Sequence, residues 1–306
     1  MSANIEITSR TPIGFIGLGY LGSRIARRLA DAGFRMTVYD RDSGKANGFS
    51  NLGVGVAPNL GMLARNVEVL MSCLPDGGAV EDVYFRTGKV LESVGTFTKI
   101  IELSTVAPET SQRLHQAGQE LSIPVLDVAV SGSTRAAESG ALTLFAGGER
   151  ADYEVAQSLF AAIASQWFYM GPSGSGTAMK LVVNTLLGLG MQAIAESLAL
   201  GRALGLPREL LFDTLSKTAV VAPAHVGKLA TAKMGDYAPQ FPLRLMRKDF
   251  GLILNEAART GLSMPATESA AISFDETASG HEEDFSAVVR QMEEQLETRS
   301  ILPPAA

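Results

Sequence analysis

The chain has 306 residues, of which 46% are hydrophobic and 19% charged, and its net charge is −6. This balance is typical of a globular protein large enough for two hydrophobic cores, and the absence of a basic patch argues against nucleic acid as a partner. The single cysteine, Cys73, excludes a disulfide framework within the chain, and the three histidines lack metal-ligand spacing. No signal pattern opens the chain and no apolar run approaches the roughly 20 residues of a membrane span, so we expect a cytoplasmic protein with no membrane partner and no metal.

The first half of the sequence alternates short apolar runs with helical patterns. Expected strands are Ile13–Gly17, Met36–Tyr39, Glu68–Cys73, Lys99–Leu103, Val125–Val128, Leu142–Ala146 and Trp167–Met170. Helical patterns lie between most of them, for example over Ser23–Ala32, Ala79–Tyr84, Glu109–Glu120 and Arg150–Ala164. This alternation predicts an α/β domain, with helices on both faces of a parallel sheet.

The pattern changes after the glycine-rich segment Gly171–Gly176. Apolar residues then follow helical spacing over Thr177–Leu204, Arg208–Lys217, Ala224–Met234, Leu243–Thr260 and Met264–Ser279. We therefore predict two domains, an α/β domain over residues 1–172 and an all-helical domain over residues 173–306. The tail after Met292 is charged and then proline-rich, and we expect it to fray.

The first expected strand runs into the spacing Gly17-x-Gly19-x-x-Gly22, and a helical stretch follows. In this context one glycine permits a tight turn, the next lets a pyrophosphate approach the backbone, and the last lets the helix pack close to the strand. Tyr20 and Leu21, inside the motif, are expected at the same site. The second strand ends at Asp40, where an acid can bind both ribose hydroxyls of adenosine.

Asp40 and Arg41 point to different cofactors. The carboxylate favours NAD because it would repel the 2′-phosphate of NADP, whereas the guanidinium could bind that phosphate. We favour NAD and leave NADP open.

Two further strand ends should border a nucleotide, because ligands of such sheets bind beyond the carboxyl ends of the strands. Leu74 and Pro75 follow the third expected strand, and Thr105 follows the fourth. Thr105 could bind the ribose or the nicotinamide, or it could cap the helix that starts near Pro108.

The segment Ser131-Gly132-Ser133 leaves a strand and turns through small residues. Free N–H groups and hydroxyls at one point suit a substrate carboxylate, although an ordinary turn would have the same composition.

Lys180 and Asn184 are four residues apart and share one face of an otherwise apolar helix. A positioned ammonium could donate a proton to a carbonyl oxygen as hydride arrives, and Asn184 could hold that oxygen. The alternative is that Lys180 extends to the surface. Lys248 and Asp249, by position alone, indicate a solvated helix face.

Four blocks, in their order along the chain, resemble the β-hydroxyacid dehydrogenase family: GFIGLGYLG, DVAVSGS, GSGTAMKLVVN and KDF. Its members include 3-hydroxyisobutyrate dehydrogenase, tartronate semialdehyde reductase, glyoxylate/succinic semialdehyde reductase and, more distantly, 6-phosphogluconate dehydrogenase. The resemblance covers the chain from about Ile13 to Met292. It implies a Rossmann-type dinucleotide-binding domain joined by a long helix to an all-helical domain, with the active site between them, in a homodimer or homotetramer.

The resemblance also implies roles for individual residues. Lys180 would be the catalytic acid/base with Asn184 beside it, residues 131–133 would hold the substrate carboxylate, and Lys248 would approach the cofactor and substrate rather than bulk water. The implied reaction is metal-independent hydride transfer between NAD(P) and a small β-hydroxyacid or its semialdehyde or oxoacid.

The sequence departs from the family pattern in two places. Ser133 stands where the family's substrate loop usually has a second glycine. Asp40-Arg41-Asp42 stands where NADP-using members often have Asn-Arg-Thr, which supports NAD. Imine reductases share the fold but usually lack a lysine at the position of Lys180. An imine reductase-like enzyme and a non-catalytic dinucleotide-binding protein remain as alternatives.

Overall fold

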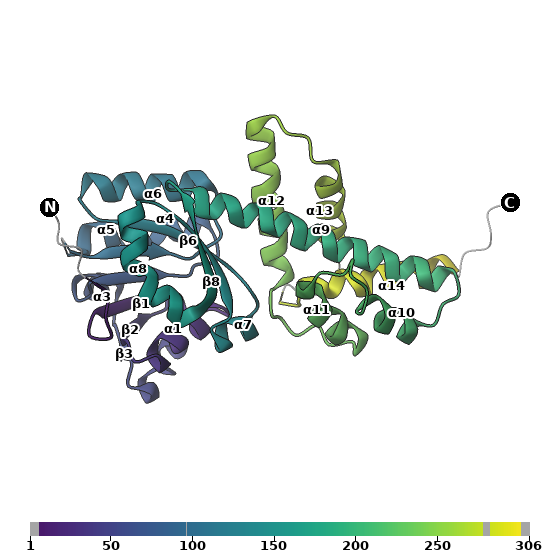
Figure 1. Cartoon of the computed structure of the whole chain (residues 1–306), viewed down its shortest axis with the longest axis horizontal. Helices are drawn as coiled ribbons and strands as arrows, with labels where there is room; N and C mark the ends of the chain where they lie inside the picture. Colours follow the sequence, from purple (N-terminus) through teal and green to yellow (C-terminus); the bar gives the residue numbers. More distant parts are fainter. Residues whose placement is uncertain (1–5, 96, 278–281, 301–306) are drawn as a thin grey trace. The chain divides into compact units, whose positions relative to one another are not determined.

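A computed structural model describes residues 6–95, 97–277 and 282–300 of the chain (Figure 1). The chain forms two compact units, residues 1–181 and residues 182–306, which divide inside a long helix, α9 (Ser175–Ala203). The boundary expected from the sequence, after residue 172, lies in the turn that precedes this helix.

An 8-stranded sheet forms the centre of the first unit, with strand order β3-β2-β1-β4-β5-β6-β7-β8. Its strands are β1 (Pro12–Ile16), β2 (Arg35–Tyr39), β3 (Gly55–Val56), β4 (Val69–Ser72), β5 (Lys99–Glu102), β6 (Val125–Ser131), β7 (Leu142–Gly147) and β8 (Ala164–Gly171). Most residues of β1 and of β4 to β7 are buried, and these strands read as largely apolar runs because both faces of the sheet are covered there.

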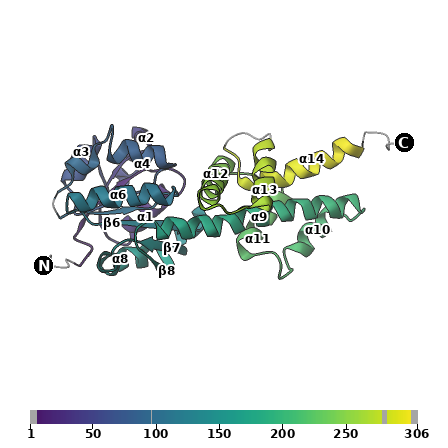
Figure 2. The same cartoon turned by 90° about the horizontal axis from the view of Figure 1, so that it is seen from above.

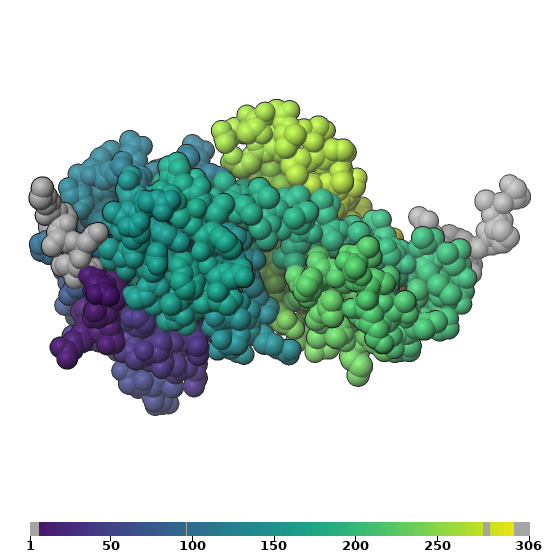
Figure 3. Space-filling model, viewed as in Figure 1, coloured from purple at the N-terminus to yellow at the C-terminus, as the bar shows by residue number. Residues whose placement is uncertain are grey.

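Helices cover both faces of this sheet, and the two layers can be followed in Figure 2. One core lies under α1 (Gly22–Asp31), α7 (Thr134–Ser139) and α8 (Arg150–Ile163). The other lies under α3 (Leu60–Arg65), α4 (Gly77–Tyr84), α5 (Val90–Ser93) and α6 (Pro108–Glu120). A short helix, α2 (Ser43–Asn47), follows β2. Figure 3 shows the chain in space-filling form, in the view of Figure 1. The predicted doubly covered α/β fold is confirmed.

The sequence predicted a parallel sheet, and one pair of strands corrects this prediction, because β6 and β7 run antiparallel. The connection between them, residues 132–141, is too short for the crossover of a dozen or more residues that parallel strands require. β3 was not predicted either, because a strand of two residues is too short to show an alternation of apolar and polar residues.

The second unit is helical, as predicted. Beyond its part of α9 it contains α10 (Arg208–Leu215), α11 (Pro223–Lys233), α12 (Leu243–Thr260), α13 (Pro265–Glu276) and α14 (Val288–Ser300). Helical structure therefore continues beyond Met292, where the sequence suggested fraying. Ser279, the expected end of one helix, lies outside the described residues.

Helix α9 is long and apolar enough, by those two measures alone, to cross a membrane, and 44% of its most apolar window is buried in the structure. Met191, Ala195 and Leu198 are at most 1% exposed. The apolar composition of these positions therefore serves the protein's own core.

Candidate functional site

The glycine motif turns the chain from β1 into α1. Gly17 has a φ of 92°, in the region that favours glycine, and an added Cβ there would lie 2.4 Å from the backbone oxygen of Cys73. A Cβ at Gly22 would lie 2.1 Å from the backbone oxygen of Gly17. Both positions therefore require glycine for the protein's own packing, as the motif predicts.

Gly19 differs from its two neighbours, because an added Cβ there would meet nothing within 4 Å. The residue is exposed and stands just ahead of the first turn of α1. The protein's own packing does not require a glycine here, whereas close approach of a phosphate to backbone N–H groups at a helix N-terminus does. The residues present thus fit the pyrophosphate of a dinucleotide.

Asp40 lies at the end of β2, beside this turn. Its Oδ2 accepts a hydrogen bond from the backbone N–H of Leu18 at 2.6 Å, and its Oδ1 accepts one from the N–H of Asp42 at 2.8 Å. Each carboxylate oxygen has a further lone pair, so the group can still accept bonds from ribose hydroxyls. Arg41 is exposed.

The other predicted cofactor residues of this unit lie at strand ends or in the glycine turn. Tyr20 is 36% exposed, and Leu21 packs against the sheet's first core. Leu74 packs against the second core, and Pro75 is exposed. Thr105 is half-buried, and it is not the cap of α6, because Ala107 occupies that position without a side-chain bond.

A buried polar network under these strand ends was not predicted. Glu102, the last residue of β5, is 1% exposed and accepts hydrogen bonds from the hydroxyl of Ser72 and from the backbone N–H of Ser104, the latter at 2.7 Å. Burial raises the pKa of Glu102 from 4.5 to about 7, and the charge of Asp127 acts in the same direction. The sequence contains one sign of this network, because Glu102 is an acid within the otherwise apolar run Ile100–Leu103.

The predicted carboxylate loop follows β6. Ser131 is half-buried, and Gly132 has a φ of 141°. Ser133 caps α7, its hydroxyl accepting a hydrogen bond from the N–H of Ala136 at 3.3 Å. The serine that replaces the family's second glycine therefore has a structural role, and its O–H remains able to donate.

Asp127 anchors the start of the helix that carries Lys180. Its Oδ1 accepts a hydrogen bond from the N–H of Gly174 at 2.8 Å, and its Oδ2 accepts one from the N–H of Thr177 at 3.1 Å. These N–H groups belong to the first turn of α9, where a negative charge is favourable. Burial nevertheless raises the pKa of Asp127. Lys180, in the next turn, is only 7% exposed, so it does not extend into solvent as the alternative reading suggested.

In the second unit, α9 and α12 bring three polar residues together. Asn184 is fully buried, and its Nδ2 donates to Oδ2 of Asp249 at 2.5 Å. Lys248 lies with its Nζ 3.0 Å from Oδ1 of Asp249, and its side chain is 22% exposed. Asp249 is 1% exposed. The pair is therefore not the solvated helix face that its position suggested.

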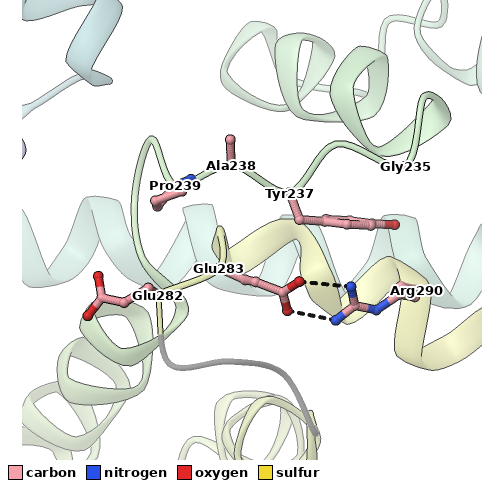
Figure 4. Close-up of a pocket in the computed structure, with 7 residues that line it drawn as sticks. All are labelled: Gly235, Tyr237, Ala238, Pro239, Glu282, Glu283 and Arg290. Carbon is pink, nitrogen blue, oxygen red and sulfur yellow. Dashed lines mark hydrogen bonds and ion pairs between the residues drawn. The ribbon is translucent and has the colours of Figure 1, made fainter.

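A pocket of about 330 Å³ in the second unit contains none of the predicted site residues (Figure 4). It is lined by Gly235, Tyr237, Ala238, Pro239, Glu282, Glu283 and Arg290. The guanidinium of Arg290 pairs with both oxygens of Glu283, at 2.9 and 2.7 Å, and lies over the ring of Tyr237. Glu282 pairs with Arg244 at 3.2 Å.

Two families match the chain, and together they span both units. Residues 12–171 match the family described as the NAD binding domain of 6-phosphogluconate dehydrogenase, and residues 174–292 match that described as NAD-binding of NADP-dependent 3-hydroxyisobutyrate dehydrogenase. The chain belongs to the β-hydroxyacid dehydrogenase family. It is accordingly an NAD(P)-dependent dehydrogenase or reductase.

Individual β-hydroxyacid dehydrogenases match nearly the whole chain. Glyoxylate/succinic semialdehyde reductase 1 of Arabidopsis thaliana is 32% identical over 279 residues, 90% of this chain and 96% of that protein. The NAD-dependent L-serine dehydrogenase of Pseudomonas aeruginosa is 33% identical, over 86% of this chain and 90% of that protein. The structure of 3-hydroxyisobutyrate dehydrogenase from Mycobacterium tuberculosis with L-serine has a TM-score of 0.81 at 28% identity, covering 92% of this chain and 99% of that chain. The oligomeric state and the cytoplasmic location stay predictions.

Proposed function

We propose that the chain transfers hydride between a nicotinamide dinucleotide and a small β-hydroxyacid, or its semialdehyde or oxoacid, with Lys180 as the proton donor and acceptor. The observation that carries this proposal is the burial of Lys180, 7% exposed, on a helix whose first turn is anchored by Asp127. An ammonium is costly to bury, and such placement is typical of a group that takes part in chemistry.

The bound dinucleotide supplies or accepts the hydride. In the reducing direction, the Nζ of Lys180 donates one proton to the carbonyl oxygen as the carbonyl carbon gains hydride, which yields the hydroxyl. In the oxidising direction, the neutral amine takes the hydroxyl proton. Asn184 lies one helical turn along the same face of α9, and the second N–H of its buried amide can donate to the reacting oxygen.

The substrate class rests on the carboxylate loop and on the relatives. Ser131, Gly132 and Ser133 offer hydroxyls and backbone N–H groups for a carboxylate. The family resemblance adds Lys248 as a further binding residue. L-serine, which occurs in the names of one relative and one solved neighbour, is itself a 3-hydroxyacid. Asp40 favours NAD over NADP, because its carboxylate would repel a 2′-phosphate.

The test is a panel of 3-hydroxyacids and semialdehydes, assayed with both nicotinamide cofactors in wild type and Lys180→Ala. We expect the variant to bind NADH as the wild type does but to lose turnover by roughly 10²- to 10⁴-fold. Lys217→Ala, which removes an exposed lysine just after α10, serves as the control and should leave both properties unchanged. Undiminished turnover in Lys180→Ala would refute the assigned role.

Cyclic imines belong in the same panel, because imine reductases share this fold. Solved imine reductases match at 17–20% identity, which supports the fold alone. Reduction of imines without reaction of any hydroxyacid or semialdehyde would overturn the proposed substrate class.

A further inference from the structure

Glu102 lies in register with two other polar residues at the carboxyl edge of the sheet. Glu102 is on β5, between β4 and β6. Its Cα partners in the parallel ladders are Ser72 on β4 and Asp127 on β6. All three residues are at most 1% exposed. Two buried carboxylates on adjacent strands are costly, because each disfavours ionisation of the other.

The carboxylate of Glu102 connects two loops through Ser104. Glu102 accepts a hydrogen bond from the backbone N–H of Ser104 at 2.7 Å. The Oγ of Ser104 in turn accepts a hydrogen bond from the N–H of Leu74 at 2.7 Å. The loop after β4, with Leu74 and Pro75, is thereby tied to the loop after β5, with Thr105.

On its other side, the network ends at a buried tyrosine. Ser72 donates to Glu102, and the hydroxyl oxygens of Ser72 and Tyr84 lie 2.6 Å apart. Tyr84 comes from α4 and is 1% exposed, and burial raises its pKa well above 10, so it stays neutral. Tyr84 and Asp127 are the titratable groups that face Glu102, and no cation is paired with it among the described residues.

We propose that Glu102 is a positioning residue for the dinucleotide: its ionised carboxylate, through Ser104 and Leu74, fixes the two loops that are expected to border the cofactor. The proposal rests on the cofactor position given above. Ionised Glu102 accepts all of its hydrogen bonds, including the one from the N–H of Ser104. A protonated Glu102 can still accept from that N–H, but the bond is no longer charge-assisted and is roughly half as strong.

Protonation therefore loosens the tie between the loops and weakens cofactor binding. With a Glu102 pKa of about 7, this change falls near neutral pH. For the wild type we expect the Kd of NADH to increase roughly three- to tenfold between about pH 8.5 and about pH 6, the effect of losing one hydrogen bond. The KM of the cofactor should follow the Kd, while kcat at saturating cofactor changes less.

The experiment compares three variants with the wild type by NADH fluorescence titration across this pH range. Glu102→Gln cannot supply a second accepting oxygen, so its Kd should stay at the weak, acid-side value at every pH. Ser104→Ala removes the contact with Leu74 and should give the same flat, weak profile. Thr98→Val removes a buried hydroxyl bonded to the backbone oxygen of Val67 at the opposite end of β5, and should keep the wild-type profile.

Two results would overturn the role of Glu102: a wild-type pH profile that persists in Glu102→Gln, or an unchanged Kd for Ser104→Ala at about pH 8.5. The second variant keeps the proposal testable if Glu102→Gln does not fold. A wild-type protein that binds no nicotinamide dinucleotide would instead overturn the cofactor site itself. Loss of activity in Lys180→Ala is independent of both results.

Discussion

Oδ2 of Asp249 lies 2.5 Å from Nδ2 of Asn184, and both residues are buried. The carboxylate accepts a hydrogen bond, so it fixes the amide with its NH₂ toward α12. The Oδ1 of Asn184 is then left as an acceptor, and it has no hydrogen-bond partner among the described residues. A buried unpaired acceptor is costly in the free protein and is suited to binding a hydrogen-bond donor of the substrate other than the reacting hydroxyl.

Two substitutions of Asp249 separate this orientation from the charge that faces Lys248. Asp249→Ala removes the acceptor, so we expect the free energy of unfolding to fall by about 1–3 kcal/mol and kcat/KM to fall at least about tenfold. Asp249→Asn also loses the charge but retains an oxygen that can accept from Asn184, so its loss should be smaller. Urea unfolding and steady-state kinetics measure both effects. Equal kcat/KM in the two variants would show that the orientation of Asn184 does not matter.

Substitutions of Gly19 and Gly22 by alanine form a second pair of variants to be compared. Gly22→Ala places a Cβ against the backbone oxygen of Gly17, so we expect a loss of about 1–3 kcal/mol in unfolding free energy. Gly19→Ala meets open space, so stability should be unchanged or rise by up to about 1 kcal/mol. Its Kd for NADH should nevertheless rise at least about tenfold, because the methyl group occupies the place of the pyrophosphate. Cofactor affinity in Gly19→Ala equal to that of the wild type would place the phosphates elsewhere.

We expect Asp40 to favour NAD over NADP. Asp40→Ser removes the charge that would repel a 2′-phosphate and the bonds to both ribose hydroxyls, so the preference for NAD should fall by roughly 10- to 100-fold. The ratio of kcat/KM for the two cofactors measures it. Arg41→Ala is the companion variant and should weaken NADP use more than NAD use. A wild-type enzyme that already prefers NADP would contradict the role given to Asp40.

Glu102 makes stability depend on pH in the direction opposite to that of a salt-bridged acid. Its folded pKa, about 7, exceeds the ordinary 4.5, so the folded state binds the proton more tightly. Below the unfolded pKa both states are protonated, and the wild type becomes less stable as the pH rises from the lower pKa to the higher. Glu102→Gln removes this pH dependence. The difference in unfolding free energy, variant minus wild type, should therefore be more positive at about pH 8 than at about pH 5, by up to about 3 kcal/mol.

Urea unfolding at both pH values tests this expectation, with Thr98→Val as a control whose effect should not depend on pH. An identical stability difference at the two pH values would mean that Glu102 does not titrate in this range. The same substitution is expected to weaken cofactor binding, so the ionised carboxylate would be retained at a cost in stability.

Local signals predicted most of the first unit. The apolar runs that became β1, β2, β4 and β5 were found within one residue of their ends, because strands buried on both faces read as continuous apolar stretches. The direction of β7 was not predictable in this way. An apolar run has no direction, and only the length of the connection from β6 forces the chain to return antiparallel.

By itself, the sequence determined the glycine turn, the acid at the end of β2 and the Lys180–Asn184 spacing, because each depends on residues close together in the chain. Tertiary structure alone decided that Glu102 and Asp127 lie side by side, that Asp127 holds the first turn of α9, and that Asp249 orients Asn184 across 65 positions of sequence. Strand register and helix packing bring such groups together, and burial then changes their hydrogen-bonding requirements and acidity. No periodicity in a single segment encodes that outcome.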